Sequence, residues 1–305
     1  MLDLNLLKIG FALLTLVMIV LGSLMNTVEK RLPSFVKQTF RYGRFAYQGN
    51  DTFLKPIEVP KRWFRHFYVF GAFFTSLIFV VVLGVYVFHG KPHPLLLALL
   101  DLLGSTSRRA NVSPTSVLLA LFLLTLQSWH RFYETWFISI YSNSYINIYH
   151  YIIGYGHYFG SVMAVLCESP GFINNQEQRV QLHFGDISFL EVIGVTMFLW
   201  ACYNQYRSAI ILANLRKNKN GQVVTTKHSI PYGGWFELVS SPHFLAEILM
   251  YMAISIILRA ANTWHVVFLW VLSNQVESGL LSHWWYKATF PNYPKERKAV
   301  IPYVL

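Results

Sequence analysis

Charged residues are scarce in this chain. Only 13% of its 305 residues are Asp, Glu, Lys or Arg, whereas 54% are hydrophobic, a balance that a water-soluble domain of this size would struggle to keep in solution. Cysteine is scarcer still, since Cys167 and Cys202 are the only two, and two cysteines supply neither a disulfide framework nor a metal site. The composition therefore excludes a disulfide-stabilised secreted domain and indicates a membrane protein.

The signatures of common phosphate-binding and hydrolytic sites are also missing. The chain contains no Walker sequence, HExxH, GxSxG or CxxC. The glycines of GYGHYFG (154–160) have the wrong spacing for a dinucleotide fingerprint and lie in an apolar aromatic stretch, so we interpret them as helix-packing residues. We find no internal repeat, which argues against an inverted-repeat transporter.

Long apolar runs, in contrast, recur along nearly the whole chain. A run of about twenty apolar residues is long enough to cross roughly 30 Å of hydrocarbon as a helix. The first run lacks a charged n-region and a small-residue cleavage site, so we interpret it as a retained anchor instead of a signal peptide. The pattern predicts an all-α integral membrane protein with about seven transmembrane helices, at 6–25, 67–89, 114–140, 145–167, 185–206, 242–258 and 263–285.

The basic residues gather in three segments. Nine Lys or Arg lie in 29–66, five in 207–234 and four after residue 285. With seven spans these segments all fall on one side, which the positive-inside rule assigns to the cytosol. The N-terminus is then lumenal and the C-terminus cytosolic. Because topology accounts for the net charge of +11, we expect no nucleic-acid partner.

One polar stripe lies in the third apolar run, within LQSWHRFYETW. Gln127, His130, Arg131 and Glu134 are spaced by three and four residues, which places them on one helix face. An internal ion pair between Arg131 and Glu134 is the simple structural interpretation. Ionisable residues at membrane depth more often mark a functional site, and an arginine near a cytosolic helix end suits a phosphate.

A second polar stripe opens the sixth run. Ser241 is the expected N-cap and Pro242 the first helical residue, and His243, Glu247 and Tyr251 follow at intervals of four. Glu247 is either bonded to a neighbouring helix or part of a site, because a helix N-terminus can hold an anion or the amide of a cofactor.

The seventh run carries a third stripe. Asn274, Glu277 and Ser278 share a face, and we leave Glu277 open between a structural and a functional role. LSHWWYK adds His283 and Tyr286, either of which could donate a proton. The basic segments NLRKNKNG and YPKERKAVIP are either topology signals or a polyphosphate site, and the 2′-phosphate of NADP requires an Arg or Lys.

Because no repeat or long tail divides the chain, we expect a single membrane domain, 1–305, with an N-terminal anchor and basic cytosolic segment at 1–66. Five segments carry a likeness to a known family: NLRKNKNG (214–221), IPYGGWFELVSSPHFLAE (230–247), LSHWWYK (281–287), YPKERKAVIPYVL (293–305) and, upstream, VPKRWFRHFY (59–68). The C-terminal third resembles the membrane steroid 5α-reductases, and within them the polyprenol (polyprenal) reductase branch. The resemblance implies an endoplasmic reticulum membrane enzyme with a cofactor-binding part at 185–305 and a cofactor site that faces the cytosol.

The activity that the resemblance implies is NADPH-dependent reduction of a carbon–carbon double bond conjugated to a carbonyl. In this branch the α-isoprene unit of polyprenal or polyprenol is saturated, giving dolichal or dolichol for dolichol-phosphate synthesis and protein N-glycosylation. The expected partners are a long-chain isoprenoid and membrane lipids. Hydride addition to the β-carbon needs a donor at the carbonyl oxygen to stabilise the enolate. An allylic alcohol has no such electron sink, so we favour polyprenal as the substrate.

The resemblance also suggests site residues. Arg131, Arg216, His243, Glu247 and Tyr286 match cofactor-contacting positions of the family, with His243 standing where relatives have asparagine. The full set that we expect at NADPH is Arg131, Asn214, Arg216, Lys217, Trp235, His243, Glu247, Tyr251, Tyr286, Tyr293, Arg297 and Lys298.

Several positions depart from the steroid enzymes. Ser229 replaces an arginine, and Gln205 and Ala209 replace an Asn and an Asp. Ser128 stands at the catalytic tyrosine, and the catalytic glutamate aligns only loosely with His66. The proton donor is therefore open among His66, Tyr68, His130 and His283.

Several other functions are compatible with part of the pattern. A steroid or enoyl-thioester reductase of the same fold would share the cofactor, and a membrane carboxyl methyltransferase would not bind NADPH. A transporter predicts repeats and midplane charge, whereas these ionisable groups gather toward cytosolic helix ends. The sequence leaves open the isoprenoid chain length, the oligomeric state, any protein partner and the glycosylation of Asn111, whose sequon is followed by Pro114.

Overall fold

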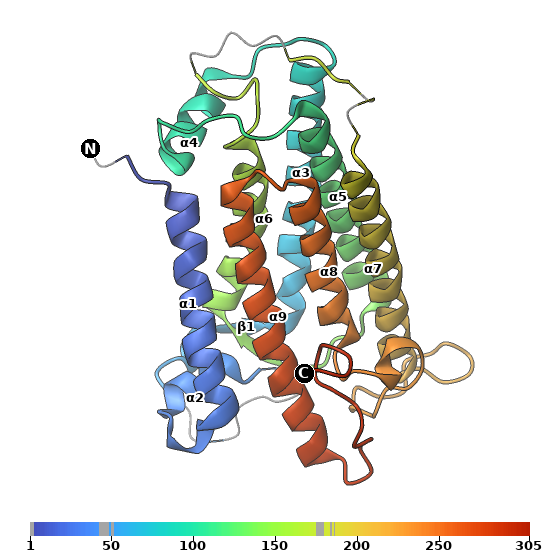
Figure 1. Cartoon of the computed structure of the whole chain (residues 1–305). Helices are drawn as coiled ribbons and strands as arrows, with labels where there is room; N and C mark the ends of the chain where they lie inside the picture. The colour runs from blue at the N-terminus through green and yellow to red at the C-terminus, as the bar shows by residue number, and fades with distance from the viewer. Residues whose placement is uncertain (1–2, 43–48, 50–51, 175–179, 184, 186) are drawn as a thin grey trace.

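The structure is a computed structural model that describes residues 3–42, 49, 52–174, 180–183, 185 and 187–305. It is a bundle of long helices that run roughly side by side (Figure 1). Each of the seven apolar runs overlaps one of these helices, so the prediction of a mostly helical protein is confirmed for the described residues, beside one short strand pair. The long helices are α1 (Leu6–Thr27), α3 (Phe64–Tyr86), α5 (Pro114–Tyr133), α6 (Ile148–Leu166), α7 (Phe189–Asn214), α8 (Pro242–Ile257) and α9 (Asn262–Thr289).

Two of the described helical segments, Leu6–Thr27 and Lys61–Tyr86, are long and apolar enough to cross a membrane by length and composition. Large apolar side chains cover their outward faces: Leu16 on α1 is 58% exposed and Phe73 on α3 is 61% exposed. Such a surface is unfavourable in water and suits lipid. The number of crossings and the orientation of the chain ends stay predictions.

Shorter elements connect the bundle. A small antiparallel pairing joins β1 (Glu58–Pro60) to β2 (Tyr145–Asn147), and a π-helical turn, Glu134–Ile138, continues α5. These elements, α2 (Ser34–Phe40) and α4 (Pro94–Gly104) were not predicted, because all of them are too short to register as apolar spans. The remaining short elements are 3-10 turns at Glu29–Arg31, Lys55–Ile57, Lys61–Trp63 and Gly234–Glu237.

The start of α8 follows the sequence signal in part. Ser241 is the N-cap residue and Pro242 the first helical residue, as predicted. The Ser241 hydroxyl, however, makes no capping hydrogen bond to the helix. Upstream, the backbone passes through the left-handed region at Gly233 (φ 94°) and Gly234 (φ 56°), which favours glycine because it has no Cβ. This turn brings the chain back to begin α8 at the end of the bundle where the C-terminus lies (Figure 1).

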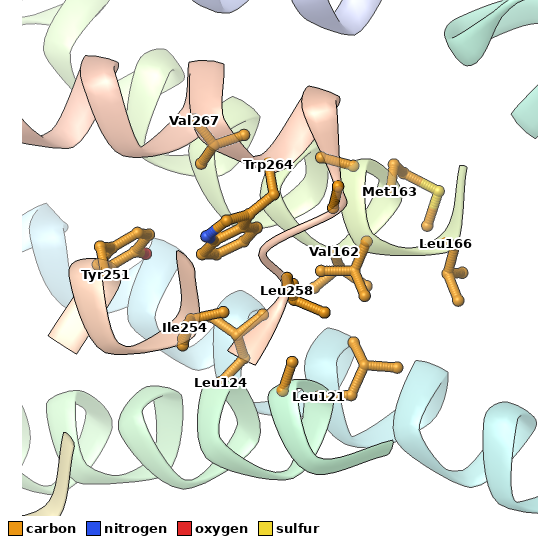
Figure 2. Close-up of a cluster of buried hydrophobic side chains, with 14 of the residues drawn as sticks. Leu121, Leu124, Val162, Met163, Leu166, Tyr251, Ile254, Leu258, Trp264 and Val267 are labelled. Atoms are coloured by element: carbon orange, nitrogen blue, oxygen red, sulfur yellow. The ribbon is translucent and has the colours of Figure 1, made fainter. Parts of the chain in front are cut away.

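The apolar core draws on all seven long helices, and Figure 2 shows the part of it where α5, α6, α8 and α9 meet. In Figure 2 the Trp264 indole lies beside the Tyr251 ring; their centroids are 5.6 Å apart with 7° between the planes. Aliphatic side chains from α5 and α6 surround the pair, and Trp264 has no exposed surface. The labelled members of the cluster are Leu121, Leu124, Val162, Met163, Leu166, Tyr251, Ile254, Leu258, Trp264 and Val267.

Glu277 on α9 is hydrogen-bonded to two side chains of α1. Ser23 Oγ donates to one carboxylate oxygen over 2.9 Å, and Asn26 Nδ2 donates to the other over 2.7 Å. Gly22 lies directly against this side chain, because a Cβ at that position would be 2.8 Å from Glu277. The contacts give Glu277 the structural role that was one of its two expected roles.

Candidate active site

Two adjoining cavities lie inside the bundle; one is lined near the end of α7 and the start of α8, and the other reaches Leu14 on α1 and Trp270 on α9. One, of about 350 Å³, is the polar cavity; the other, of about 400 Å³, is the apolar cavity. They share one wall, so a ligand in one is next to a ligand in the other. The shared residues are Tyr42, Phe64, Tyr68, Arg131, Gln205, His243, Phe244 and Ser278.

The polar cavity is lined by cations. Lys61, Arg131, Arg216 and Lys227 reach it, and no Asp or Glu is among its described lining residues. Arg216 is held by the carbonyl oxygen of Ile140 and by nearby His228. Positive side chains without a carboxylate among them are the setting that a polyphosphate requires.

Glu247 lines the apolar cavity with both carboxylate oxygens already engaged. Gln127 Nε2 donates to Oε1 over 2.8 Å from α5, and Gln205 Nε2 donates to Oε2 over 2.6 Å from α7. These contacts match the simple interpretation that Glu247 bonds neighbouring helices. Glu247 also lines the cavity, so the same carboxylate is available to a ligand.

The side-chain oxygens of Gln127 and Gln205 can each accept a further hydrogen bond. Gln127 and Gln205 are 1% and 2% exposed, and the side-chain oxygen of each lacks a partner among the described residues. Buried amide oxygens normally accept a hydrogen bond. Because Gln205 lines both cavities, a ligand amide there would find an acceptor oxygen and the Glu247 carboxylate together. The residues present therefore fit the carboxamide of a nicotinamide cofactor, and the cations of the polar cavity fit its phosphates.

Tyr68 and Arg131 form a donor pair on the shared wall. Arg131 Nη2 donates to the Tyr68 hydroxyl over 3.0 Å, and the guanidinium lies 5.0 Å from the Tyr68 ring centre. Arg131 also pairs with the fully buried Glu134, so the predicted ion pair is present. Since Tyr68 accepts from Arg131, its own hydroxyl proton can be donated to a ligand oxygen.

The four expected proton donors are not brought together. Among the described residues that line the two cavities, Tyr68 is the only one of the four. His66 is exposed and lies 3.1 Å from the hydroxyl of Tyr151. His130 lies 3.3 Å from Glu134, and His283 lies 2.6 Å from the Ser240 hydroxyl.

The expected cofactor residues separate into two groups. Five of them line a cavity: Arg131, Arg216, His243, Glu247 and Tyr286. Among the described lining residues the other seven do not appear: Asn214, Lys217, Trp235, Tyr251, Tyr293, Arg297 and Lys298.

Two of the second group support the first. Tyr293 stacks on Tyr286 with ring centroids 5.3 Å apart. Arg297 is 2% exposed; it donates to the Pro231 carbonyl over 3.0 Å and its guanidinium lies 5.2 Å from the Tyr293 ring centre. Burial raises the pKa of Tyr293, so this hydroxyl stays protonated at neutral pH. The C-terminal segment thereby braces the wall that carries Tyr286.

Some lining residues escaped the sequence interpretation. Lys227 and His228 lie within the basic segment 207–234, from which Arg216 and Lys217 were selected, and Lys61 lies within VPKRWFRHFY. Tyr141 also lines the polar cavity, and burial, followed by the nearby Tyr68, raises its pKa well above the ordinary value. Tyr141 is thus a neutral hydroxyl donor.

The GYGHYFG segment combines packing and lining. Gly154 packs as predicted, because a Cβ there would lie 2.6 Å from the Phe67 ring. His157 and Tyr158 of the same segment line the apolar cavity. Because the whole segment was interpreted as helix packing, neither His157 nor Tyr158 was predicted as a cavity residue.

The apolar cavity reaches the outer surface of the bundle. Its wall includes Leu14, Val17, Met18 and Leu21 of α1 and Trp270 of α9. Val17 is 51% exposed, so the cavity reaches the surface of the bundle beside α1. A long apolar ligand with a polar end therefore has a lined path from that surface to Tyr68.

Comparisons with known proteins agree with these features. The family described as 3-oxo-5-alpha-steroid 4-dehydrogenase matches residues 170–305. A Drosophila melanogaster protein named polyprenal reductase is 39% identical over 99% of this chain and 94% of its own length. Polyprenal reductases of Caenorhabditis elegans and Homo sapiens are 37% and 35% identical, over 87% and 82% of this chain and 85% and 79% of their own lengths.

Proposed function

Since the chain belongs to the steroid 5α-reductase family, and within it to the polyprenal reductases, we propose that it reduces the α-isoprene double bond of polyprenal with NADPH. As a member of this family it is a reductase that acts on carbon–carbon double bonds. The observation that carries the choice of substrate is the Tyr68–Arg131 pair, which lies where the cation-lined and apolar cavities meet.

The polar cavity supports NADPH as the cofactor. A bound nicotinamide cofactor supplies the hydride. Arg216 and Lys227 neutralise its phosphates, and Glu247 accepts an N–H of its carboxamide, with Gln127 and Gln205 holding the carboxylate in place.

Tyr68 performs the electrostatic part of the reaction. Its hydroxyl donates a hydrogen bond to the aldehyde oxygen, where negative charge develops as the β-carbon is reduced. Arg131 stabilises that charge through Tyr68, because a donor to the hydroxyl makes the hydroxyl a better donor in turn. The aldehyde oxygen is the electron sink that an allylic alcohol lacks, so the arrangement favours polyprenal over polyprenol. Among the expected donors we therefore take Tyr68, since His66, His130 and His283 lie off the cavities.

The location follows from the same features. We infer a multi-pass protein of the endoplasmic reticulum membrane with a lumenal N-terminus and seven crossings. The cavities lie beside the basic segments 29–66 and 207–234, so they open toward the cytosol, where NADPH is found. The isoprenoid chain extends along the apolar cavity toward α1 and the lipid, and its product enters dolichol synthesis.

The test is turnover by the purified protein in lipid nanodiscs. NADPH oxidation is followed with polyprenal, polyprenol or a 3-oxo-Δ4 steroid, and the lipid products are identified by mass spectrometry. We expect dolichal from polyprenal and no product from the other two. Reduction of the alcohol without prior oxidation, or preference for the steroid, would overturn the choice of substrate. Absence of NADPH binding would overturn the function as a whole.

A further inference from the structure

His157 on α6 and Tyr251 on α8 form a polar pair beside the apolar cavity. His157 lines that cavity, and its Nε2 lies 2.6 Å from the Tyr251 hydroxyl. The other ring nitrogen, Nδ1, is buried and lacks a partner among the described residues. A buried imidazole nitrogen is normally hydrogen-bonded, so an unpartnered one in the wall of a cavity marks a place for a ligand.

The pair lies near the proposed reaction centre. Tyr251 is one helical turn from Glu247 on α8. Tyr158, which follows His157, contacts the Tyr68 ring edge-on at a centroid distance of 6.0 Å. Tyr68, Glu247 and His157 all line the apolar cavity. A ligand whose oxygen lies at Tyr68 therefore shares its cavity with His157.

The proposed reaction needs one proton that Tyr68 does not supply. Reduction of the double bond adds a hydride to the β-carbon and a proton to the α-carbon. Tyr68 is engaged at the oxygen, where it stabilises the enolate. A second acid is required at the α-carbon for the saturated aldehyde to form.

We propose that His157, relayed by Tyr251, protonates the α-carbon of the enolate; this inference rests on the proposed function. For this step the Tyr251 O–H donates to Nε2 and the imidazole hydrogen lies on Nδ1, the ring nitrogen without a partner among the described residues. The enolate electron pair takes the Nδ1 proton, the new C–H bond forms and the carbonyl is restored. Nε2 takes the Tyr251 proton, and the resulting phenolate is later protonated by water.

The electron balance closes with the reduced nicotinamide as the hydride donor. The substrate gains one hydride and one proton, and the cofactor is oxidised. The transfer is favourable because the α-carbon of an aldehyde enolate is a much stronger base than a tyrosine phenolate. The relay also avoids an imidazolate, since Nε2 gains a proton as Nδ1 loses one.

The alternative is that the hydrogen bond simply joins α6 to α8. A tether would affect stability alone, whereas an acid at the α-carbon must also act in reverse on the product. By microscopic reversibility it removes the α-proton of a saturated aldehyde. That exchange requires no hydride transfer and so can be measured apart from the overall reduction.

The experiment measures α-proton exchange in heavy water. Purified enzyme with NADP⁺ is incubated with citronellal, a saturated isoprenoid aldehyde at the relevant bond, and deuterium at the α-carbon is followed by NMR against an enzyme-free background. We expect exchange by the wild type and a roughly 100-fold slower rate in His157→Phe, the lower end of the range for a lost acid–base group. Tyr251→Phe, which keeps the ring beside Trp264 and loses only the hydroxyl, should also slow exchange.

The matched control is His265→Gln. His265 lies in the first turn of α9, where its side chain bonds to the Arg259 carbonyl, and it lines neither cavity. The His265→Gln variant should therefore exchange the α-proton at the wild-type rate. NADP⁺ affinity and thermal melting report whether each variant is folded. If His157→Phe does not fold, Tyr251→Phe alone decides.

Each result bears on one claim. Unchanged exchange in folded His157→Phe and Tyr251→Phe would overturn the relay, as would a wild type that reduces polyprenal without exchanging the α-proton. Failure of the wild type to reduce polyprenal would instead overturn the proposed function.

Discussion

Arg131 joins Tyr68 to Glu134: it donates to the Tyr68 hydroxyl over 3.0 Å and pairs with a glutamate that has no exposed surface. A buried guanidinium needs such a counter-charge, because an unpaired one is costly. Glu134 begins the π-helical turn after α5, and turns of this kind are frequent at functional sites. The ion pair with Glu134 holds the guanidinium of Arg131 in position to donate to the Tyr68 hydroxyl, where the two cavities meet.

The Tyr68 hydroxyl is the first test of this arrangement. Tyr68→Phe removes one donor to the developing oxyanion, so we expect kcat to fall by roughly 100- to 1,000-fold. NADPH affinity should stay within about twofold, because the hydroxyl is assigned to the aldehyde oxygen. Single-turnover kinetics and a binding titration measure the two. Tyr203→Phe, on an outward-facing residue that is 58% exposed, is the control, and a kcat for Tyr68→Phe like that of the control would exclude Tyr68 as the donor.

Glu247 provides the second test. Glu247→Gln removes the charge that receives hydrogen bonds from Gln127 and Gln205, and we expect NADPH binding to weaken by about 1 to 3 kcal/mol. Titration of the purified variant measures the change. Glu277→Gln is the matched control, because Glu277 is bonded to Ser23 and Asn26 on α1. It should lower the melting temperature and leave NADPH affinity unaltered. Equal affinities for NADPH in the two folded variants would return Glu247 to a structural role.

Arg216 tests the assignment of the phosphates. Arg216→Gln should weaken NADPH binding by about 1.5 to 3 kcal/mol, as for a hydrogen bond to a charged group. It should also make binding less sensitive to salt, because one cation fewer faces the phosphates. Titrations at two ionic strengths measure both effects. Lys91→Gln, an exposed lysine that lines neither cavity, controls for net charge. An unchanged salt dependence in Arg216→Gln would place the phosphates elsewhere.

The sequence predicted the helices well because their apolar length is a local property. Helix α3 begins at Phe64 where 67 was expected, and α7 extends to Asn214 beyond the expected end at 206. That extension begins with Arg207 and Ser208, polar residues that interrupt the apolar run. Helix α4 was missed because its 11 residues are too few to register as a span.

The site was predictable only within single helices. Periodicity placed Gln127, Arg131 and Glu134 on one face, and the structure confirms contacts from that face. The bond from Gln127 to Glu247 depends on how α5 packs against α8, which no local pattern encodes. His66 and Tyr68 are two residues apart, so they point to different sides of α3. Sequence could not decide which one faces inward; the packing places Tyr68 at the cavities.

The α1 wall of the apolar cavity is the last test, and it concerns chain length. Val17 lines the cavity and is 51% exposed, whereas Leu16 is 58% exposed and does not line it. Val17→Trp adds bulk where we expect the isoprenoid chain to leave the protein. Overfilling a packed site costs about 1 to 3 kcal/mol, so kcat/KM for long-chain polyprenal should fall roughly tenfold or more. Citral, a two-unit enal that ends before α1, should be reduced nearly as well as by the wild type, and Leu16→Trp should affect neither substrate. An unchanged kcat/KM for long-chain polyprenal in folded Val17→Trp would mean that the chain leaves by another route, because a substrate that passes α1 must sense the added indole.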